Sequence, residues 1–255
     1  MQINLISDVH FRTDGLAEAN RDADVFVCLG DLILFLDYDD PAEGIFANLF
    51  GTANSARYIE MRRRFKFDEA RAFSRELFES IGAEPWQAIS EQVAAQYAKL
   101  FAAMPGGLMT YGNVDLPVMW PEYVRSDQQV LDGETTEIDG LRVGFVGGGL
   151  QTPYRTPFEI SDEDFQRKVD QLGEVDVLCT HIPPAVPEIC YDIVARRLER
   201  GSTALLRYIE EVQPRYAVHG HVHQPLASRT TIGRTEVINV GHFRSLGQPY
   251  RLIVN

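Results

Sequence analysis

The sequence has few cysteines, no long hydrophobic run and no excess of positive charge. Its three cysteines, Cys28, Cys179 and Cys190, form no C-x-x-C pair, and the first two fall inside apolar runs, which predicts buried thiols in a reducing compartment. No stretch approaches the ~20 apolar residues of a membrane span. Met1 leads almost directly into an apolar run, so we expect no signal peptide, a cytoplasmic location and no membrane partner.

The charge balance argues against a nucleic-acid partner. The 24 basic and 37 acidic residues give a net charge of -13, whereas binding to nucleic acid or to an anionic membrane begins with cationic contacts. The remaining proportions, 45% hydrophobic and 24% charged, are those of a soluble globular protein. We predict a single domain over residues 1–255, because this length is enough for one large core.

Five short polar motifs follow one another along the chain. They are Asp8-Val9-His10, Gly30-Asp31, Gly112-Asn113-Val114-Asp115, Thr180-His181 and Gly220-His221-Val222-His223. Four of them follow apolar runs that are expected to be buried strands, namely Ile3–Ile6, Val25–Leu29, Val175–Cys179 and Tyr216–Val218, and the Asn113 motif follows the weaker run Leu108–Tyr111. Loops at the carboxyl ends of strands are the usual place for sites, and oxygen and imidazole ligands suit divalent metals.

Each motif alone has an ordinary structural explanation. A simple turn accounts for Asp-x-His or Gly-Asp, and a single histidine after a strand is more often a hydrogen-bonded structural residue. Asp8 and His10 are two residues apart, as are His221 and His223, so each pair can share one face of an extended segment. Asp31 has two carboxylate oxygens and could bridge two ions. The conjunction of all five motifs therefore favours a metal site.

Residues 38–106 are predicted to form a helical insertion. Apolar residues recur every three or four positions over 70–81 and 86–104, which is the spacing of amphipathic helices. Strands dominate the rest of the chain, and Asp139-Gly140 predicts a tight hairpin turn within 134–146. This pattern predicts an α/β fold with a mixed sheet core and helices outside.

The ordered motifs resemble those of the calcineurin-like binuclear metallophosphoesterases, whose pattern is Asp-x-His, Gly-Asp, Gly-Asn-His-Asp/Glu, a histidine after a strand, and Gly-His-x-His. The resemblance extends over residues 8–223. A branch of phosphoesterases related to cyclic-nucleotide phosphodiesterases is the most similar, on the evidence of Thr180-His181-Ile182-Pro183-Pro184, Gly201-Ser202, Gln213-Pro214 and Asn239-Val240-Gly241. The resemblance implies a four-layer α-β-β-α sandwich of two mixed β-sheets, here with the helical insertion.

The resemblance also implies two divalent metal ions, with manganese favoured over iron, zinc, cobalt or nickel. It assigns Asp8, His10, Asp31 and His223 to one ion, and Asp31, Asn113, His181 and His221 to the other, with Asp31 as the bridge. Asp31 and Asn113 are accordingly the expected catalytic residues. A hydroxide between ions about 3.5–4 Å apart would attack phosphorus, and the ions would neutralise charge on the phosphoryl oxygens.

One position departs from the family pattern. The family usually has a histidine after the asparagine, assigned to substrate binding or leaving-group protonation, and this chain has Val114 instead. The candidate substitutes are His242, Tyr154 and Arg155, with a surface or structural role as the alternative for each. Of these we expect Arg155 and His242 to bind substrate. We expect Asp115 to orient a ligand and not to bind metal itself.

These observations predict a binuclear metal-dependent hydrolase of phosphate esters, most readily a phosphodiesterase that acts on small substrates. The alternatives are a phosphomonoesterase or nuclease of the same fold, or a non-catalytic metal-binding interaction scaffold. If the insertion borders the mouth of the site, its Arg62–Arg64 cluster would attract anionic substrates. Alternatively, its apolar helix faces would join two copies of the chain in a homo-oligomer.

Overall fold

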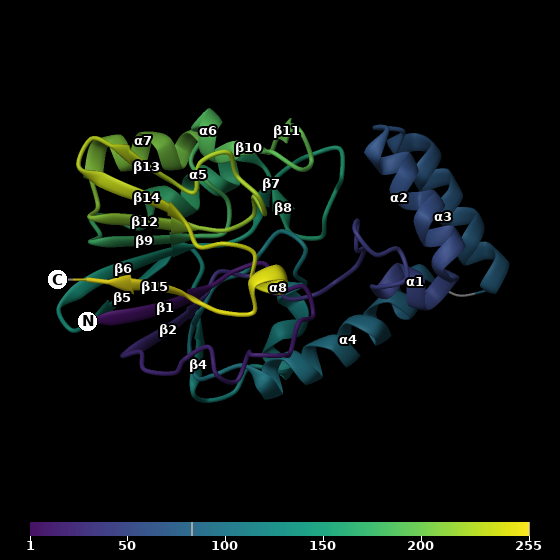
Figure 1. Cartoon of the computed structure of the whole chain (residues 1–255), viewed down its shortest axis with the longest axis horizontal. Coiled ribbons are helices and arrows are strands. Elements are labelled where there is room, and N and C mark those ends of the chain that lie inside the picture. Colours follow the sequence, from purple (N-terminus) through teal and green to yellow (C-terminus); the bar gives the residue numbers. More distant parts are fainter. Residues whose placement is uncertain (83, 255) are drawn as a thin grey trace.

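Two mixed β-sheets form the centre of the computed structural model, which describes residues 1–82 and 84–254 (Figure 1). The first sheet consists, in spatial order, of β15 (Tyr250–Ile253), β1 (Gln2–Ile6), β2 (Val25–Cys28), β3 (Gly107–Met109) and β4 (Gln128–Val130). Only β15 runs antiparallel to its neighbour, and the other pairs are parallel.

The second sheet has parallel strands in its centre and an antiparallel strand at each edge. Its spatial order is β13 (Arg229–Ile232), β14 (Thr235–Asn239), β12 (Tyr216–His219), β9 (Val177–Thr180), β6 (Leu141–Val146) and β5 (Glu134–Ile138). The predicted hairpin is the β5–β6 pair. Its turn residues Asp139 and Gly140 have φ angles of 49° and 78°, the left-handed backbone of a tight hairpin turn.

Side chains that alternate along the strands separate the core into layers. In β1, Ile3 and Leu5 face the space between the sheets, whereas Ile6 packs on the outer side with the long helix that follows Glu84. Val27 in β2 likewise joins residues of the second sheet in the central layer. The two sheets are therefore stacked on a shared apolar layer, and each sheet has a second apolar layer on its outer face.

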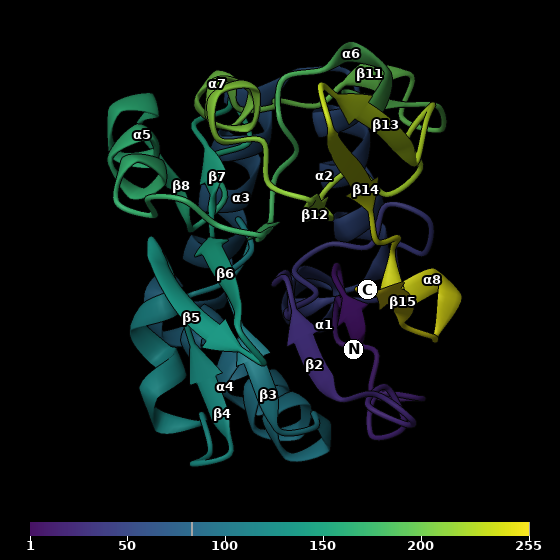
Figure 2. The ribbon, with the colours of Figure 1, turned by 90° about the vertical axis from the view of Figure 1, so that its left-hand side faces the viewer.

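Helices cover both outer faces. On the second sheet lie α5 (Asp162–Asp170) and α7 (Thr203–Val212), and on the first sheet lie α4 (Pro85–Ala103) and the 3-10 helix η1 (Pro117–Glu122). Figure 2 shows α5 and α7 on one side of the sheets and α4 on the other. Ser161 and Ser202 cap α5 and α7 as the sequence indicates. The predicted four-layer sandwich is confirmed.

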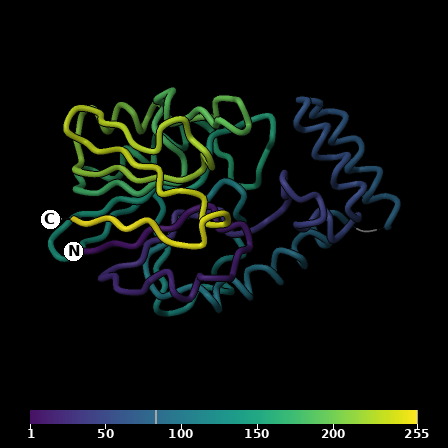
Figure 3. Tube along the Cα trace, viewed as in Figure 1, coloured from purple at the N-terminus to yellow at the C-terminus, as the bar shows by residue number. Residues whose placement is uncertain are grey.

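The remaining short elements lie outside the two large sheets. They are β7 (Gly149–Leu150), β8 (Glu159–Ile160), α6 (Pro187–Cys190), β10 (Tyr191–Asp192), β11 (Arg197–Leu198) and α8 (Phe243–Leu246). The two ends of the described chain lie side by side at one edge of the sheets (Figure 3), where the Met1 amino group donates a hydrogen bond to the Val254 carbonyl.

The helical block contains α1 (Ile45–Phe50), α2 (Thr52–Arg63), α3 (Phe67–Ile81) and α4. The helices α2 and α3 stand away from the sheets and form what we call the arm (Figure 1). Ile81 and Trp86 lie on the predicted apolar faces, yet they are 47% and 53% exposed because the ends of α3 and α4 project beyond the sandwich. The treatment of 38–106 as an insertion within one domain stays a prediction.

Candidate metal centre

All five motifs lie at the carboxyl ends of parallel strands. The loops that follow β1, β2 and β3 come from the first sheet, and those that follow β9 and β12 come from the second. Since both sheets present these ends to the same edge of the sandwich, the seven predicted ligands lie together at that edge.

The first group of side chains surrounds Asp8 and His10. The Nε2 atom of His10 is 3.3 Å from Nε2 of His223, 3.9 Å from Oδ1 of Asp8 and 3.8 Å from Oδ2 of Asp31. Nε2 of His223 is also 3.3 Å from Oδ1 of Asp8. Four potential ligand atoms thus converge on one small volume, as the first of the two predicted ion sites requires.

The second group is built around His181, which is fully buried. Its Nε2 atom is 3.0 Å from Oδ1 of Asn113 and 3.4 Å from Oδ2 of Asp31. The ring of His221 lies edge-on to it, with 5.2 Å between the two ring centroids. Asp31, His181 and His221 could hold one ion among them, with the Asn113 oxygen as a further ligand.

Asp31 joins the two groups through a single oxygen. Its Oδ2 atom faces both His10 and His181, whereas its Oδ1 atom accepts a hydrogen bond of 3.0 Å from the Val114 backbone N–H. The hydrogen bond fixes the rotation of the carboxylate so that Oδ2 stays between the groups. This arrangement is the one that a bridging ligand needs.

Hydrogen bonds outside the ligand groups orient the ligands. The Nδ1 atoms of His10 and His181 lie 3.1 and 2.9 Å from the carbonyl oxygens of Ile33 and Leu29, which leaves both Nε2 atoms for the centre. The Asn113 amide nitrogen donates to the Thr156 hydroxyl, so its oxygen points to His181. These hydrogen bonds therefore direct the ligand atoms toward the centre.

The charges at this edge favour cations. Burial would raise the pKa of Asp8, but His223 and the neighbouring imidazoles outweigh it and hold that pKa well below its usual value. Burial would lower the pKa of His181, but the Asp31 carboxylate raises it to about 9. Asp8 Oδ1 is buried and accepts no well-aligned hydrogen bond among the described residues, although Nε2 of His223 lies 3.3 Å away. A buried carboxylate oxygen among imidazoles fits a divalent ion.

The backbone of the motifs is unusual in two ways. Asp8, His10, Asp31 and His221 all have positive φ angles between 41° and 66°, a conformation that costs energy outside glycine and gathers at functional sites. Gly112 is required for a different reason, because a Cβ atom there would overlap the Asp31 side chain. The motif glycines thus allow loops from different strands to approach closely.

Asp115 links two of the three ligand loops of the first sheet, those that follow β2 and β3. Its carboxylate accepts hydrogen bonds of 2.8–2.9 Å from the backbone N–H groups of Asp31, Leu32 and Gly112, and it is fully buried. The hydroxyl of Tyr97 on α4 lies 3.4 Å from the same carboxylate. Asp115 therefore holds the loop of Asp31 against the loop of Asn113.

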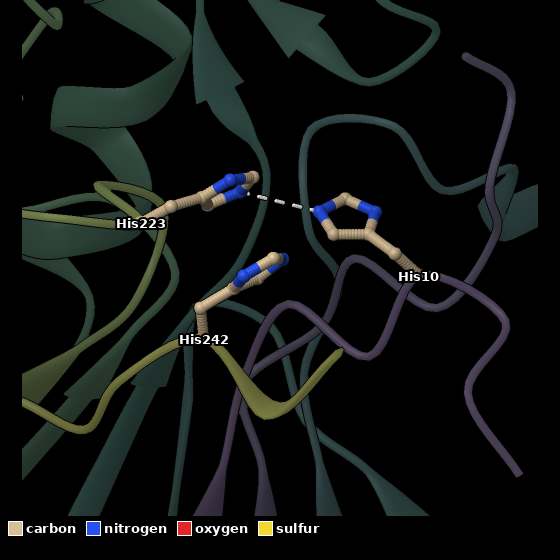
Figure 4. Close-up of side chains that lie close together, drawn as sticks. All are labelled: His10, His223 and His242. Carbon is tan, nitrogen blue, oxygen red and sulfur yellow. Dashed lines mark hydrogen bonds between the residues drawn. The ribbon is translucent and has the colours of Figure 1, made fainter. Parts of the chain in front are cut away.

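His242 stacks on the first ligand group (Figure 4). Its ring is parallel to that of His223, with 4.0 Å between centroids, and lies edge-on to His10 at 5.6 Å. The Ser245 hydroxyl holds its Nδ1 atom at 2.7 Å, and its Nε2 atom is buried without a partner among the described residues. Three imidazoles from distant segments thus gather at one point, and His10, His223 and His242 could themselves hold an ion.

A cavity of about 1500 Å³ opens over both groups. Its walls include ligands from each group, the expected substrate residues Arg155 and His242, and residues of the helical block such as Arg62 and Trp86. Sequence reasoning did not predict that Arg197 on β11 would reach this wall, because an isolated arginine carries no local signal of its partners.

The family model of the calcineurin-like phosphoesterases matches residues 1–225 of this chain. The chain belongs to the calcineurin-like phosphoesterase family. It is therefore a metal-dependent phosphoester hydrolase by family, and members of this family typically bind two divalent metals. The Asp and His clusters described above are the corresponding candidates in this calcineurin-like phosphoesterase.

Solved structures agree with this family in fold. One crystal structure aligns over 95% of this chain and 91% of its own, with a TM-score of 0.56 and 16% identity. The crystal structure of TT1561 of Thermus thermophilus aligns over 95% of this chain and 90% of its own, with a TM-score of 0.53 and 13% identity. No curated protein sequence shows a significant match. Within residues 1–82 and 84–254, no helix combines the length and apolarity that a membrane crossing needs.

Proposed function

We propose that this chain is a two-metal phosphodiesterase that acts on small phosphate esters. The observation that carries the proposal is the sharing of one Asp31 oxygen by two groups of mostly buried ligands at the base of a large cavity. Asp8, His10, Asp31 and His223 would hold one ion, and Asp31, Asn113, His181 and His221 the other. When bound, two such ions supply a water of lowered pKa as nucleophile and neutralise charge on the phosphoryl oxygens.

The chain's own residues would position the ester. Arg155 lines the cavity, where its guanidinium can donate two parallel hydrogen bonds to phosphoryl oxygens. His242 lines the same cavity, and its ring would contact a phosphoryl oxygen there. Both side chains would hold the phosphate over the ligand groups and limit the access of competing water molecules.

The residue that follows Asn113 sets the preference for leaving groups. Val114 lines the cavity but carries no proton donor, and its backbone N–H is used by Asp31. A leaving alkoxide therefore departs without help from this position, whereas a nitrophenolate needs little help because it is a weak base. We expect activated aryl diesters to be cleaved much faster than alkyl diesters.

A substrate panel on the metal-reconstituted protein tests this proposal. Bis(p-nitrophenyl) phosphate, p-nitrophenyl phosphate, a dialkyl phosphate and a single-stranded oligonucleotide would be compared with Mn²⁺, and then with Fe²⁺, Zn²⁺, Co²⁺ and Ni²⁺. The proposal requires the aryl diester to be the best substrate. Faster turnover of the monoester or of the oligonucleotide would replace it with a phosphomonoesterase or a nuclease. Two bound metals with no turnover of any ester would indicate a metal-binding scaffold.

A further inference from the structure

The wall of the cavity on the side of the arm contains two arginines on one tyrosine ring. The guanidinium carbon of Arg62 on α2 lies 4.9 Å from the centroid of the Tyr154 ring, and that of Arg197 on β11 lies 4.7 Å from the same centroid. The two cations are therefore separated by no more than the sum of those distances. Phe67 of α3 also packs edge-on to Tyr154, at 4.9 Å.

Arg62 has unused hydrogen-bonding capacity. Over residues 1–82 and 84–254 no hydrogen bond or ion pair of the Arg62 side chain is found, and the guanidinium group lies against the rings of Tyr58 and Tyr154. Its Nε atom is buried without a partner. A guanidinium group offers five N–H donors in a rigid fork that matches phosphate and carboxylate. Arg62 is thus held in place by the rings while its donors remain available.

Arg197 is only partly neutralised. Its Nε atom donates to the Glu199 carboxylate at 2.7 Å, and its Nη1 atom donates to the Tyr154 hydroxyl. Glu199 is the one carboxylate paired with either guanidinium among the described residues, so the two arginines keep a net positive charge. An anion that contacted both groups would be stabilised by both.

The two arginines come from separate parts of the fold but line the same cavity as the ligand groups. Pockets for a single drug-sized ligand usually measure about 300–1,000 Å³, so this cavity of about 1500 Å³ exceeds the need of one phosphate ester. We propose that Arg62 and Arg197 form a second anion-binding subsite. The substrate is then a phosphodiester in which the alcohol that stays esterified to phosphorus after hydrolysis carries another phosphate or carboxylate. This inference rests on the proposed phosphodiesterase function.

A pair of substrates that differ in one phosphate tests the subsite. The metal-loaded protein would be assayed with thymidine 5′-(p-nitrophenyl phosphate) and with its 3′-phosphorylated form. We expect kcat/KM to be about 10-fold or more higher for the 3′-phosphorylated form, since each charge-assisted contact strengthens binding. The advantage should fall to about 2-fold or less in Arg62→Gln and in Arg197→Gln, while the activity on the simpler diester changes little.

Arg64→Gln is the matched control. Arg64 lies on the same arm and carries the same charge, but it is paired with Glu60 at 2.6 Å and does not line the cavity. The inference predicts that this variant keeps the full advantage of the second phosphate. An equal loss in Arg64→Gln would show a general effect of charge and would overturn the subsite. Circular dichroism would verify that Arg197→Gln, which loses an ion pair, remains folded, and Arg62→Gln removes no such pair.

A binding measurement separates failure of the subsite from failure of the proposed function. Isothermal titration would compare thymidine 3′,5′-bisphosphate with thymidine 5′-monophosphate on the metal-loaded protein, without turnover. Tighter binding of the bisphosphate that depends on Arg62, in a protein that hydrolyses no ester, would support the subsite and reject the phosphodiesterase. Hydrolysis with no preference between the paired substrates, or with a preference that both arginine variants retain, would overturn the subsite alone.

Discussion

We call the edge of the two sheets that carries the seven predicted ligands the metal edge. The metal edge and the arm are stabilised in different ways. At the metal edge, His181 and Asp115 are fully buried, and each ligand loop is tied to another by hydrogen bonds from backbone groups. In the arm, several charged side chains are exposed and pair with near neighbours in the sequence, as Lys66 does with Glu69 and Arg71 with Asp68. Exposed pairs of this kind contribute little stability, about 0–1 kcal/mol each.

The difference indicates that the metal edge is suited to the chemistry and the arm to the recognition of substrate. A ligand displaced by about 1 Å no longer binds its ion well, so the ligand loops need a rigid support from both sheets. The arm touches the rest of the cavity through side chains such as Arg62 and Phe67, which contact Tyr154. Its sequence could therefore change the preferred substrate without disturbing the ligands.

The helix α4 belongs to the helical block but contacts the ligand loops. The side chain of Gln96 accepts a hydrogen bond of 2.8 Å from the Leu34 N–H and donates one to the Leu34 carbonyl, just after the Asp31 loop. The Tyr97 hydroxyl accepts a hydrogen bond from the Leu116 N–H. Within the helical block, α4 thus supports the site, whereas α2 and α3 extend away from it (Figure 1).

The largest expected effect comes from Asp31→Asn. The neutral amide removes the shared charge from both ligand groups, so we expect loss of at least one ion per chain and a fall in hydrolysis of more than ~100-fold. Metal content and the rate on bis(p-nitrophenyl) phosphate would be measured together. Asp39→Asn, which removes an exposed carboxylate from the same cavity, is the control and should retain metal and activity. Two retained ions with normal activity in Asp31→Asn would refute the shared-ligand assignment.

Asp115→Ala should have the next largest effect, on stability. It leaves three buried N–H groups without acceptors, so we expect unfolding free energy to fall by about 3–5 kcal/mol. On the arm, Asp68 is 99% exposed, and Asp68→Ala should change stability by about 0.5 kcal/mol or less. Urea unfolding of both variants makes the comparison. Similar losses in the two variants would remove the contrast between the regions.

Val114→His should alter chemistry at the metal edge alone. A proton donor at this position would assist poor leaving groups, so we expect alkyl diesters to be cleaved about 10-fold faster or more, with a smaller gain for nitrophenyl diesters. Val114→Gln introduces a side chain similar in size to histidine but without an acidic proton, and it should give no such gain. Unchanged dependence of the rate on leaving-group pKa in Val114→His would indicate that another group already donates the proton.

Tyr97→Phe should have the smallest effect. The variant removes one buried hydroxyl that joins α4 to the ligand loops, so unfolding free energy should fall by about 1–2 kcal/mol. Tyr250→Phe is matched to it, because that hydroxyl accepts an exposed hydrogen bond from Arg229 at 2.5 Å. Thermal unfolding of the pair would test whether α4 contributes to the support of the site. An effect no larger in Tyr97→Phe than in Tyr250→Phe would show that it does not.

The sequence predicted the metal edge well because its information is local. Each ligand motif follows a strand, so recognising β1, β2, β9 and β12 was enough to place six of the seven ligands at one edge. The seventh, Asn113, follows the weaker apolar run of β3. The alternating burial of short strands and the Asp139-Gly140 turn are local signals of the same kind. The roles assigned to the individual ligands stay predictions.

The arm was less predictable for physical reasons. The sequence of α2 has no apolar stripe, and the helix buries only Ser55 and Ile59. It was therefore predicted as part of the helical insertion but without bounds of its own. The apolar spacing around Trp86 did predict a helix, but it could not show that this end projects beyond the sheets. The meeting of Arg62 and Arg197 on Tyr154 depends on three distant segments, and no local pattern encodes it.

Electron paramagnetic resonance of the protein titrated with Mn²⁺ tests the central claim most directly. If Asp31 is shared by two adjacent sites, the first equivalent of Mn²⁺ gives an isolated six-line signal, and the second converts it into the broad signal of a coupled pair. Saturation should then occur at two ions per chain. A single bound ion, or two ions whose signals stay independent, would contradict the account of a binuclear centre bridged by Asp31.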